Sequence, residues 1–212
     1  MPVIVLDSVG KAFKGRPLLY NVNAEINEGI TYGIQGPNGS GKSVLFKLMC
    51  GFLKPDEGTV SIDPAYLSPS RVFPEHFGVI IDRPGSLPHR TGLENLRSLA
   101  KIRGKIGDDQ IIPAMERVGL DPDLRQKVRH HSLGMKQKLA LAQAIMEDQR
   151  VLLLDEPFNA LDASSVRHIR TLLRELSAEG RTIVMTSHNQ EDIDELCQEV
   201  HMVNSQTLEK VR

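Results

Sequence analysis

The sequence predicts an α/β fold with a parallel sheet, and three observations support this prediction. Two short apolar segments, Val151–Leu154 and Thr182–Thr186, have the continuous hydrophobicity of strands that are covered on both faces. A stripe of apolar residues at helical spacing lies between them, and alternation of strand and helix is typical of parallel sheets with right-handed crossovers. A glycine-rich turn over residues 36–43 also lies between a predicted strand and a predicted helix.

The N-terminal part of the chain is predicted to be β structure that leads into this turn. Residues 3–30 are predicted strands, because apolar residues alternate with mostly polar ones from Leu18 to Ile26. Residues 31–35 form a short predicted strand, and the apolar residues after the turn have the spacing of a helix that ends near Gly51. Further strands are predicted at residues 59–62 and 77–81.

Residues 91–147 differ from the rest of the chain because helical patterns dominate them. The pattern is interrupted near four residues that break helices: Gly104, Gly107, Gly119 and Pro122. We interpret this region as a helical subdomain. The helix that follows the strand at residues 151–154 has an apolar stripe from Val166 to Leu176 and is predicted to end near Gly180.

Charge and composition exclude several classes of protein. The 26 basic and 27 acidic residues give a net charge of −1, so no basic field indicates a nucleic-acid partner. No apolar run approaches the roughly 20 residues that span a bilayer, and the first seven residues lack the basic region of a signal peptide. We therefore expect a cytoplasmic protein, with any membrane-spanning part supplied by a partner. Cys50 and Cys197 are expected to be ordinary buried thiols.

The glycine-rich turn matches the phosphate-binding pattern G-x-x-x-x-G-K-S. Its residues are Gly36, Pro37, Asn38, Gly39, Ser40, Gly41, Lys42 and Ser43. Glycines let the backbone direct several N–H groups at phosphate oxygens, and the following helix N-terminus favours an anion. Lys42 can reach the β- and γ-phosphates, and the Ser43 hydroxyl can bind Mg²⁺. The alternative is a turn that contains Lys-Ser by chance, and the flanking strand and helix argue against it.

Two carboxylates, Asp155 and Glu156, follow the strand at residues 151–154. Ligands of open α/β sheets bind at the carboxyl ends of strands, so Asp155 is expected to hold Mg²⁺ or its bound water, and Glu156 to polarise an attacking water. The alternative is two solvated charges at a strand end. His188 follows the next predicted strand and could reach the γ-phosphate or orient the water, although an isolated histidine is more often structural or merely exposed.

The order and spacing of these motifs resemble the ATP-binding subunit of ABC transporters over residues 3–203. The shared motifs are Phe13 at the adenine-stacking position, residues 36–43 at the phosphate loop, His131–Gln137 at the L-S-G-G-Q signature, Asp155-Glu156-Pro157 at the magnesium aspartate and catalytic glutamate, Asn159–Asp162 at the D-loop, and His188 at the switch histidine. The resemblance implies one ABC-type domain over residues 1–212. A P-loop NTPase (RecA-like) core with a mainly parallel sheet and an N-terminal antiparallel β-subdomain would together take about residues 1–90 and 148–212. A helical subdomain would take about residues 91–147.

Two departures from the family pattern bear on function. Leu133 and Met135 stand where the signature usually has glycine and glutamine, a version that resembles the ATPase subunits of bacterial exporters for bacitracin-like peptides and lantibiotics. Ser132 and Gly134, which the family uses for phosphate contact, are present. Asp82 stands where the family usually has a glutamine that approaches Mg²⁺. It keeps an oxygen but is shorter and charged.

The resemblance also implies a mechanism with ATP and Mg²⁺ as cofactors. Two such subunits, expected to be a homodimer, would pack head to tail, so that the phosphate loop of one faces the signature of the other and ATP joins them. Hydrolysis would part the halves and move separate permease subunits through the surface around residues 82–89 and the helical region after it. The protein would lie on the inner face of the cell membrane, touch it only through the permease, and bind no nucleic acid. Export is favoured by the signature variant.

These arguments give three sets of candidate site residues. The catalytic candidates are Glu156 and His188. The ATP-binding candidates are Phe13, Gly36, Pro37, Asn38, Gly39, Ser40, Gly41, Lys42, Ser43, Ser132, Gly134 and Asp162; the metal candidates are Ser43, Asp155 and Asp82. Asp162 could bridge two subunits or cap a helix, and Phe13 could instead be a strand or core residue. A P-loop small-molecule kinase would leave the signature and D-loop unexplained, and ABC ATPases that remodel DNA or ribosomes generally need a coiled coil or two cassettes.

Overall fold

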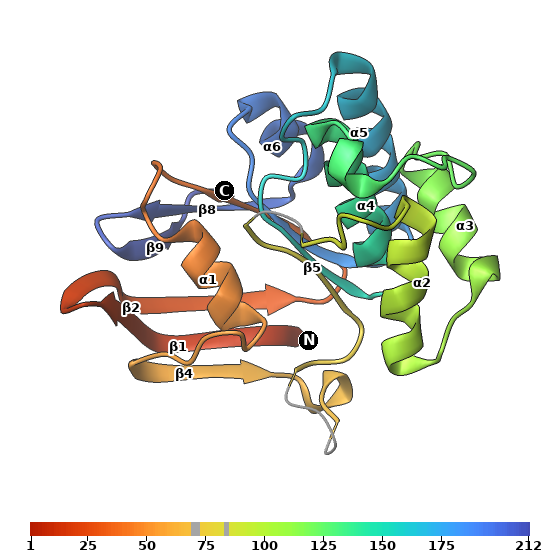
Figure 1. Cartoon of the computed structure of the whole chain (residues 1–212). Helices are drawn as coiled ribbons and strands as arrows, with labels where there is room; N and C mark the ends of the chain where they lie inside the picture. Colours follow the sequence, from red (N-terminus) through yellow and green to blue (C-terminus); the bar gives the residue numbers. More distant parts are fainter. Residues whose placement is uncertain (69–72, 83–84) are drawn as a thin grey trace.

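Two sheets form the β structure in the computed structural model, which describes residues 1–68, 73–82 and 85–212 (Figure 1). An antiparallel sheet has the order β2-β1-β4, with β1 at Pro2–Phe13, β2 at Arg16–Asn27 and β4 at Glu57–Ile62. A six-stranded sheet has the order β5-β6-β7-β3-β8-β9, with β3 at Thr31–Gln35, β5 at Phe77–Ile80, β6 at Val151–Leu154, β7 at Thr182–Met185, β8 at Glu199–Asn204 and β9 at Thr207–Lys210. All its pairs are parallel except β8 with β9.

The helices begin at residues whose side chains or conformations suit helix starts. They are α1 at Lys42–Met49, α2 at Gly92–Arg103, α3 at Asp108–Arg117, α4 at Leu133–Ile145, α5 at Ala163–Ala178 and α6 at Gln190–Leu196. Thr91 and Glu94 form a reciprocal capping box on α2. Ser132, Asp162 and Asn189 accept hydrogen bonds from the first turns of α4, α5 and α6. Short 3₁₀ turns occur at Pro64–Tyr66 and Val128–His130.

The six-stranded sheet has an apolar core on each face. Val151 and Leu153 of β6 belong to a cluster that joins the antiparallel sheet, α1 and β3, so α1 lies between the two sheets. Leu152 and Leu154 belong to the other cluster, which α2, α3, α4 and α5 build on the opposite face (Figure 1). Because alternate residues of β6 face both cores, its hydrophobic run is continuous.

Most predicted elements are present. The strands predicted at residues 31–35 and 151–154 match β3 and β6, and residues 91–147 contain α2, α3 and α4. Cys50 and Cys197 are buried and free, as predicted. The sequence did not predict α6, β8 or β9. The seven residues of α6 are mostly acidic and too few to show a clear helical period. Within the described ranges, no helix is both long and apolar enough to cross a membrane.

Candidate active site

The glycine-rich loop lies between β3 and α1, and its backbone needs glycine. Gly36, Gly39 and Gly41 have φ values of 145°, 79° and 104°, in the region that side chains disfavour. A Cβ on Gly36 would also lie 2.6 Å from the carbonyl oxygen of Val203. The Lys42 ammonium donates to the carbonyl oxygens of Gly36 at 2.7 Å and Pro37 at 3.0 Å. The lysine therefore lies over the loop whose amides would bind phosphate.

Two hydroxyl groups, those of Ser43 and Thr186, connect the loop to Asp155 and Asp155 to the backbone of Glu156. The Ser43 hydroxyl at the start of α1 donates to Asp155 Oδ2. Thr186 Oγ1 donates to Asp155 Oδ1 at 2.8 Å and accepts from the Glu156 N–H at 2.8 Å. The parallel pairing of Leu154 with Met185 brings these residues together, because each of the two strands ends there. The sequence analysis missed Thr186, and only the register of β6 against β7 could have identified it.

The oxygen donors at this point fit a magnesium ion. Ser43 supplies a hydroxyl and Asp155 a carboxylate, and their oxygens are already in contact. Mg²⁺ prefers hard oxygen ligands and is usually held by one or two protein groups together with substrate phosphates and water. Ser43 and Asp155 could therefore hold Mg²⁺ beside a phosphate chain bound to the loop.

Glu156 has the properties expected of a base. Its φ of 54° is unusual for a residue other than glycine, and Gln137 of α4 donates to its carbonyl oxygen at 3.2 Å. Its side chain is 17% exposed, and Oε1 lies 3.2 Å from His188 Nε2. Burial raises the pKa of Glu156 above its ordinary value, the charge of Asp155 adds to this shift, and His188 opposes it. A carboxylate of raised pKa beside a histidine is suited to accepting a proton from water.

These groups surround a hollow of about 290 Å³ at the mouth of the loop. Its walls are formed by the glycine-rich loop, both carboxylates and His188. Two apolar residues that the sequence analysis did not select, Leu18 and Val44, complete the walls. A Cβ on Gly41 would lie 3.2 Å from Leu18 Cγ, so this leucine packs directly on the loop. No local motif marks Leu18, because the contact joins β2 to the loop.

Phe13 lies at the end of β1, and its ring is 45% exposed. It is therefore a strand residue outside the core. Lys11 Nζ is 5.7 Å from the ring centroid, so the ring already faces a cation. Phe13 is not one of the residues that wall the hollow at the loop in the described part of the chain. Its exposed face is free to stack on a flat group, and adenine stacking stays a prediction.

The signature region forms the start of α4 and packs against the D-loop of the same chain. Ser132 caps α4 by accepting from the Met135 N–H at 3.1 Å, and Leu133 is 71% exposed. A Cβ on Gly134 would lie 2.8 Å from the carbonyl oxygen of Ala160, so this glycine permits a close backbone approach. The exposed end of α4 is a second place where free N–H groups could meet an anion.

Asp162 caps α5, as one of its two predicted roles requires. Its Oδ1 accepts from the Ser164 hydroxyl at 2.6 Å and from the Ser165 N–H at 2.8 Å. These hydrogen bonds, that from Ser164 first, lower the pKa of Asp162 to about 2. The carboxylate therefore stays charged at neutral pH. Its role between subunits stays a prediction.

Asp82 is paired with a residue that the sequence analysis did not consider. Its carboxylate lies 2.5 Å from Nζ of Lys47 on α1, and its φ is 59°. Asp82 also borders a larger hollow, of about 900 Å³, whose walls include Ser43, Asp155 and Leu133. The Asp82 carboxylate therefore borders the same hollow as Ser43 and Asp155, the two candidate Mg²⁺ ligands, but it is already paired with Lys47. Two of the residues predicted to form the surface after it, 83 and 84, lie outside the described residues.

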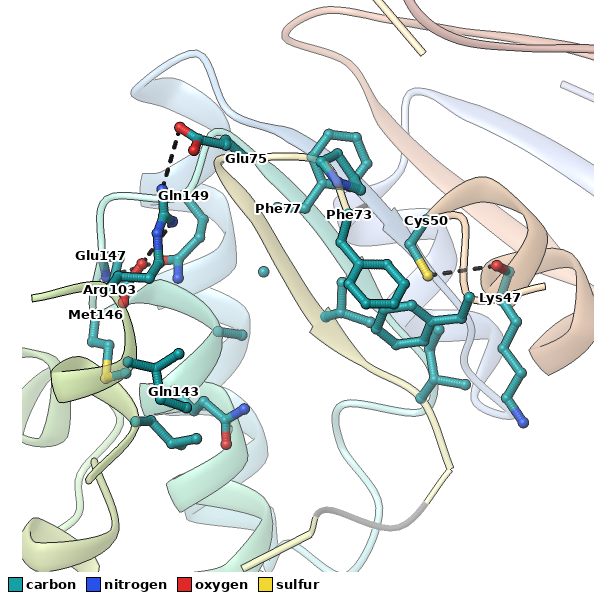
Figure 2. Close-up of a pocket in the computed structure, with 18 of the residues that line it drawn as sticks. Lys47, Cys50, Phe73, Glu75, Phe77, Arg103, Gln143, Met146, Glu147 and Gln149 are labelled. Carbon is teal, nitrogen blue, oxygen red and sulfur yellow. Dashed lines mark hydrogen bonds and ion pairs between the residues drawn. The ribbon is translucent and has the colours of Figure 1, made fainter. Parts of the chain in front are cut away.

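A third hollow, of about 780 Å³, is lined by residues of α1, β5, α2 and α4 (Figure 2). Phe52 and Phe73 form an edge-to-face pair with ring centroids 5.1 Å apart, and both are about half exposed. On the opposite wall, Arg103 lies between Glu147, at 2.7 Å, and Glu75, at 3.4 Å (Figure 2). We call this hollow the groove. It offers exposed aromatic surface beside a polar wall that carries two carboxylates and one guanidinium.

Comparison with known proteins identifies the family. The pattern of the family described as ABC transporter matches residues 19–159. An uncharacterised ABC transporter ATP-binding protein of Bacillus subtilis, YybJ, is 39% identical over 95% of this chain and 94% of its own length. The chain belongs to the ABC transporter family. This ABC chain is an ATP-binding subunit and an ATPase, as the motifs predicted, and the kinase alternative is not favoured.

Two named transport proteins and a solved structure are also similar to this ABC chain. The bacitracin transport ATP-binding protein BcrA of Enterococcus faecalis is 36% identical over 92% of this chain and 64% of its own length, so BcrA is longer. The lantibiotic transport ATP-binding protein SrtF of Streptococcus pyogenes is 29% identical over 92% and 83%. A dimeric structure of the ATP-binding cassette MJ0796 with ADP and Pi superposes with a TM-score of 0.85 at 26% identity, covering 99% of both chains. The predicted fold class and the likeness to these transport proteins are confirmed.

Proposed function

We propose that this ABC subunit hydrolyses ATP at the hollow beside the phosphate loop and drives export through separate permease subunits. The observation that carries the proposal is the chain of contacts from Ser43 through Asp155 and Thr186 to Glu156. It places two oxygen ligands and a base of raised pKa next to a phosphate-binding loop. This arrangement supplies what phosphoryl transfer to water requires: charge neutralisation, positioning and a proton acceptor.

The residues of the hollow divide the work of hydrolysis. The loop amides and Lys42 would hold the β- and γ-phosphates, while Ser43 and Asp155 would hold Mg²⁺, which would supply positive charge to the phosphate oxygens. Glu156 accepts a proton as the oxygen of water forms a bond to the γ-phosphorus and the bond to ADP breaks. His188, 3.2 Å from Glu156, orients this carboxylate and the water. Asp82 remains a candidate third metal ligand, which would first have to leave Lys47.

ATP is also held by a second copy of the chain in this proposal. The exposed start of α4, with Ser132 and Gly134, would meet the γ-phosphate bound to the partner's loop, and Asp162 would face the junction of the two sites. Phe13 would stack on adenine from the same chain as the loop. The exposure of Leu133 at the helix start supports such a contact, since this apolar side chain is mostly uncovered in the single chain. A homodimer is the simplest assembly with these properties.

The groove is the proposed contact with the permease, on the inner face of the cell membrane. Its aromatic pair and Glu75 belong to the P-loop core, and Arg103 and Glu147 belong to the region of α2 and α4. A segment seated there would therefore sense any rotation between them. Bacitracin-like peptides or lantibiotics are candidate cargo, because proteins named for their transport are 36% and 29% identical to this chain. We propose that residues 91–147 rotate relative to the rest of the chain, with the boundaries of the moving part at residues 91 and 147.

One experiment tests the central claim. The mass of purified Glu156→Gln protein is measured in solution with and without Mg²⁺-ATP. A shift from monomer to dimer with ATP, abolished by Ser132→Arg, is expected. A monomer in both conditions, although ATP binding is confirmed, would contradict pairing by ATP alone and would mean that the permease is needed to align the halves. Transfer of phosphate from ATP to an added metabolite would instead reopen the kinase alternative.

A further inference from the structure

His188 lies at the edge of the hollow with an exposed ring. Its side chain is 57% exposed, and its ring contacts Glu156 at 3.2 Å across the edge of the hollow. An exposed ring has few packing neighbours that could fix its rotamer or its distance from the carboxylate. The position of His188 therefore depends on what fixes the residues on either side of it, Ser187 and Asn189.

A buried carboxylate fixes those flanking residues. The Ser187 hydroxyl donates to Asp192 Oδ2 at 2.5 Å and accepts from the Asn189 N–H at 3.1 Å. One hydroxyl thus joins the backbone on both sides of His188 to the side chain of Asp192. Asp192 lies in the first turn of α6 and is only 2% exposed. Hydrogen bonds to a buried charged group are stronger and more directional than those between neutral groups.

The charge of Asp192 is compensated by Arg170 of α5. Arg170 Nε donates to Asp192 Oδ1 at 2.7 Å, and a second guanidinium nitrogen lies 2.5 Å from the same oxygen. Arg170 is itself buried, at 8% exposed. It also contacts Glu191 at 2.9 Å and Glu195 at 3.1 Å, but neither of these hydrogen bonds reaches Ser187. A buried carboxylate without such a partner would be strongly unfavourable, and the guanidinium supplies that partner where Ser187 needs an acceptor.

We propose that Asp192, held by Arg170, is a positioning residue that sets the place of His188 through the Ser187 hydroxyl. The proposal rests on the proposed role of His188 in hydrolysis and extends it to two residues on α5 and α6. Asp192 is not one of the described residues that wall the hollow, and it acts only on the backbone that carries the histidine. Displacement of a catalytic group by about 1 Å can lower a rate by up to about a hundredfold, so loss of this anchor affects turnover more than ATP binding.

The test is a kinetic double-mutant cycle in single-turnover assays with enzyme in excess over ATP. Asp192→Asn and Ser187→Ala are each expected to lower the hydrolysis rate by about five- to tenfold, with the concentration of enzyme that gives half-maximal rate changed less than about twofold. In a His188→Ala background, either change is expected to lower the rate by less than about 1.5-fold. Glu191→Gln is the matched control, because it removes a carboxylate from Arg170 without touching Ser187, and Ser187→Thr keeps the hydroxyl.

A structural readout accompanies the kinetics. The imidazole signals of His188, assigned by their loss in His188→Ala, are expected to shift in Ser187→Ala and to stay in place in Glu191→Gln. Equal losses of rate with and without His188 would overturn the positioning role while leaving the catalytic site intact. Full activity of His188→Ala would overturn the proposed role of His188 itself, and unshifted imidazole signals in Ser187→Ala would overturn the anchor. If Asp192→Asn does not fold, Ser187→Ala carries the test, because it leaves the Arg170 ion pair in place.

Discussion

Thr186→Val removes one hydroxyl from the centre of the site and keeps nearly the same volume. Thr186 is fully buried, and its hydroxyl makes two hydrogen bonds, one to the Asp155 carboxylate and one from the Glu156 N–H, both at 2.8 Å. Valine can make neither. The substitution therefore leaves a buried N–H without an acceptor and deprives a carboxylate of one donor, in a place where side chains cannot shift far.

The magnitude follows from these two losses. A hydrogen bond to a charged group contributes about 1.5–3 kcal/mol, and a buried donor left unsatisfied costs about 1–3 kcal/mol. Since neighbouring losses are not additive, we expect Thr186→Val to lower the free energy of unfolding by about 2–4 kcal/mol. For a chain of this size each kcal/mol lowers the melting temperature by about 2–4 °C. The rate of ATP hydrolysis per folded molecule is expected to fall at least about tenfold, because Asp155 and Glu156 both lose a positioning contact.

A matched control lies on β7, the strand that leads to Thr186. Thr182 of β7 is also fully buried, and its hydroxyl accepts from the Gly29 N–H at 2.9 Å, far along the strand from the carboxylates. Thr182→Val should lower the melting temperature but leave hydrolysis per folded molecule unchanged. Thermal unfolding and an ATPase assay on both variants make the comparison. If the two variants lose activity in the same proportion, Thr186 acts only through stability and the positioning argument is wrong.

Three further predictions concern other parts of the site. Glu156→Gln should raise the free energy of unfolding at pH 7, because burial raises the pKa of Glu156 and its ionised form is disfavoured in the fold; denaturant titrations should show this difference unchanged above the pKa of the folded carboxyl, shrinking as the pH falls through that pKa, and gone below the ordinary pKa of the unfolded carboxyl. Asp155→Asn should raise the Mg²⁺ concentration for half-maximal hydrolysis by more than about tenfold. Asp82→Asn should raise it by about two- to threefold at most, since Asp82 is paired with Lys47 of α1. Equal effects of the two substitutions would mean that Asp82 and Asp155 both bind Mg²⁺. Gly134→Ala should lower the free energy of unfolding by about 1–3 kcal/mol, because its Cβ would lie 2.8 Å from a D-loop oxygen, whereas Gly85→Ala, with nothing within 4 Å, should change it little.

The parts of the site that could be predicted are those that depend on neighbours in sequence. The phosphate loop is one continuous run, and its glycines are needed by its own backbone angles, so the motif and its flanking elements identify it. Asp155 and Glu156 follow a strand whose burial on both faces is visible in its composition. The caps at Ser132 and Asp162 likewise depend on the residues two or three positions later.

The rest depends on contacts between distant segments. Gln137 reaches the carbonyl oxygens of Glu156 and Pro157, and Gly134 packs on the D-loop, because α4 happens to cross that turn. Such crossings require the order β5-β6-β7-β3, which alternation of strands and helices does not determine. The ion pair of Asp82 is a similar case. The family pattern suggests a metal contact there, while the position of α1 offers Lys47 as a nearer partner.

The end of β7 shows why this site should be sensitive to single hydroxyl groups. Thr186 and Ser187 are consecutive, and their side chains contact different neighbours. Thr186 holds the Asp155 carboxylate and the Glu156 N–H after β6, and Ser187 is held by Asp192 of α6. His188 follows directly and faces Glu156. The distance between Glu156 and His188 is therefore set by two anchoring residues, Thr186 on the Glu156 side and Asp192 on the His188 side. Neither of them is a catalytic group. Loss of the Thr186 anchor should impair the placement of metal and water together. Loss of the Asp192 anchor should impair only the contribution of His188, and kinetics with and without His188 can measure this difference.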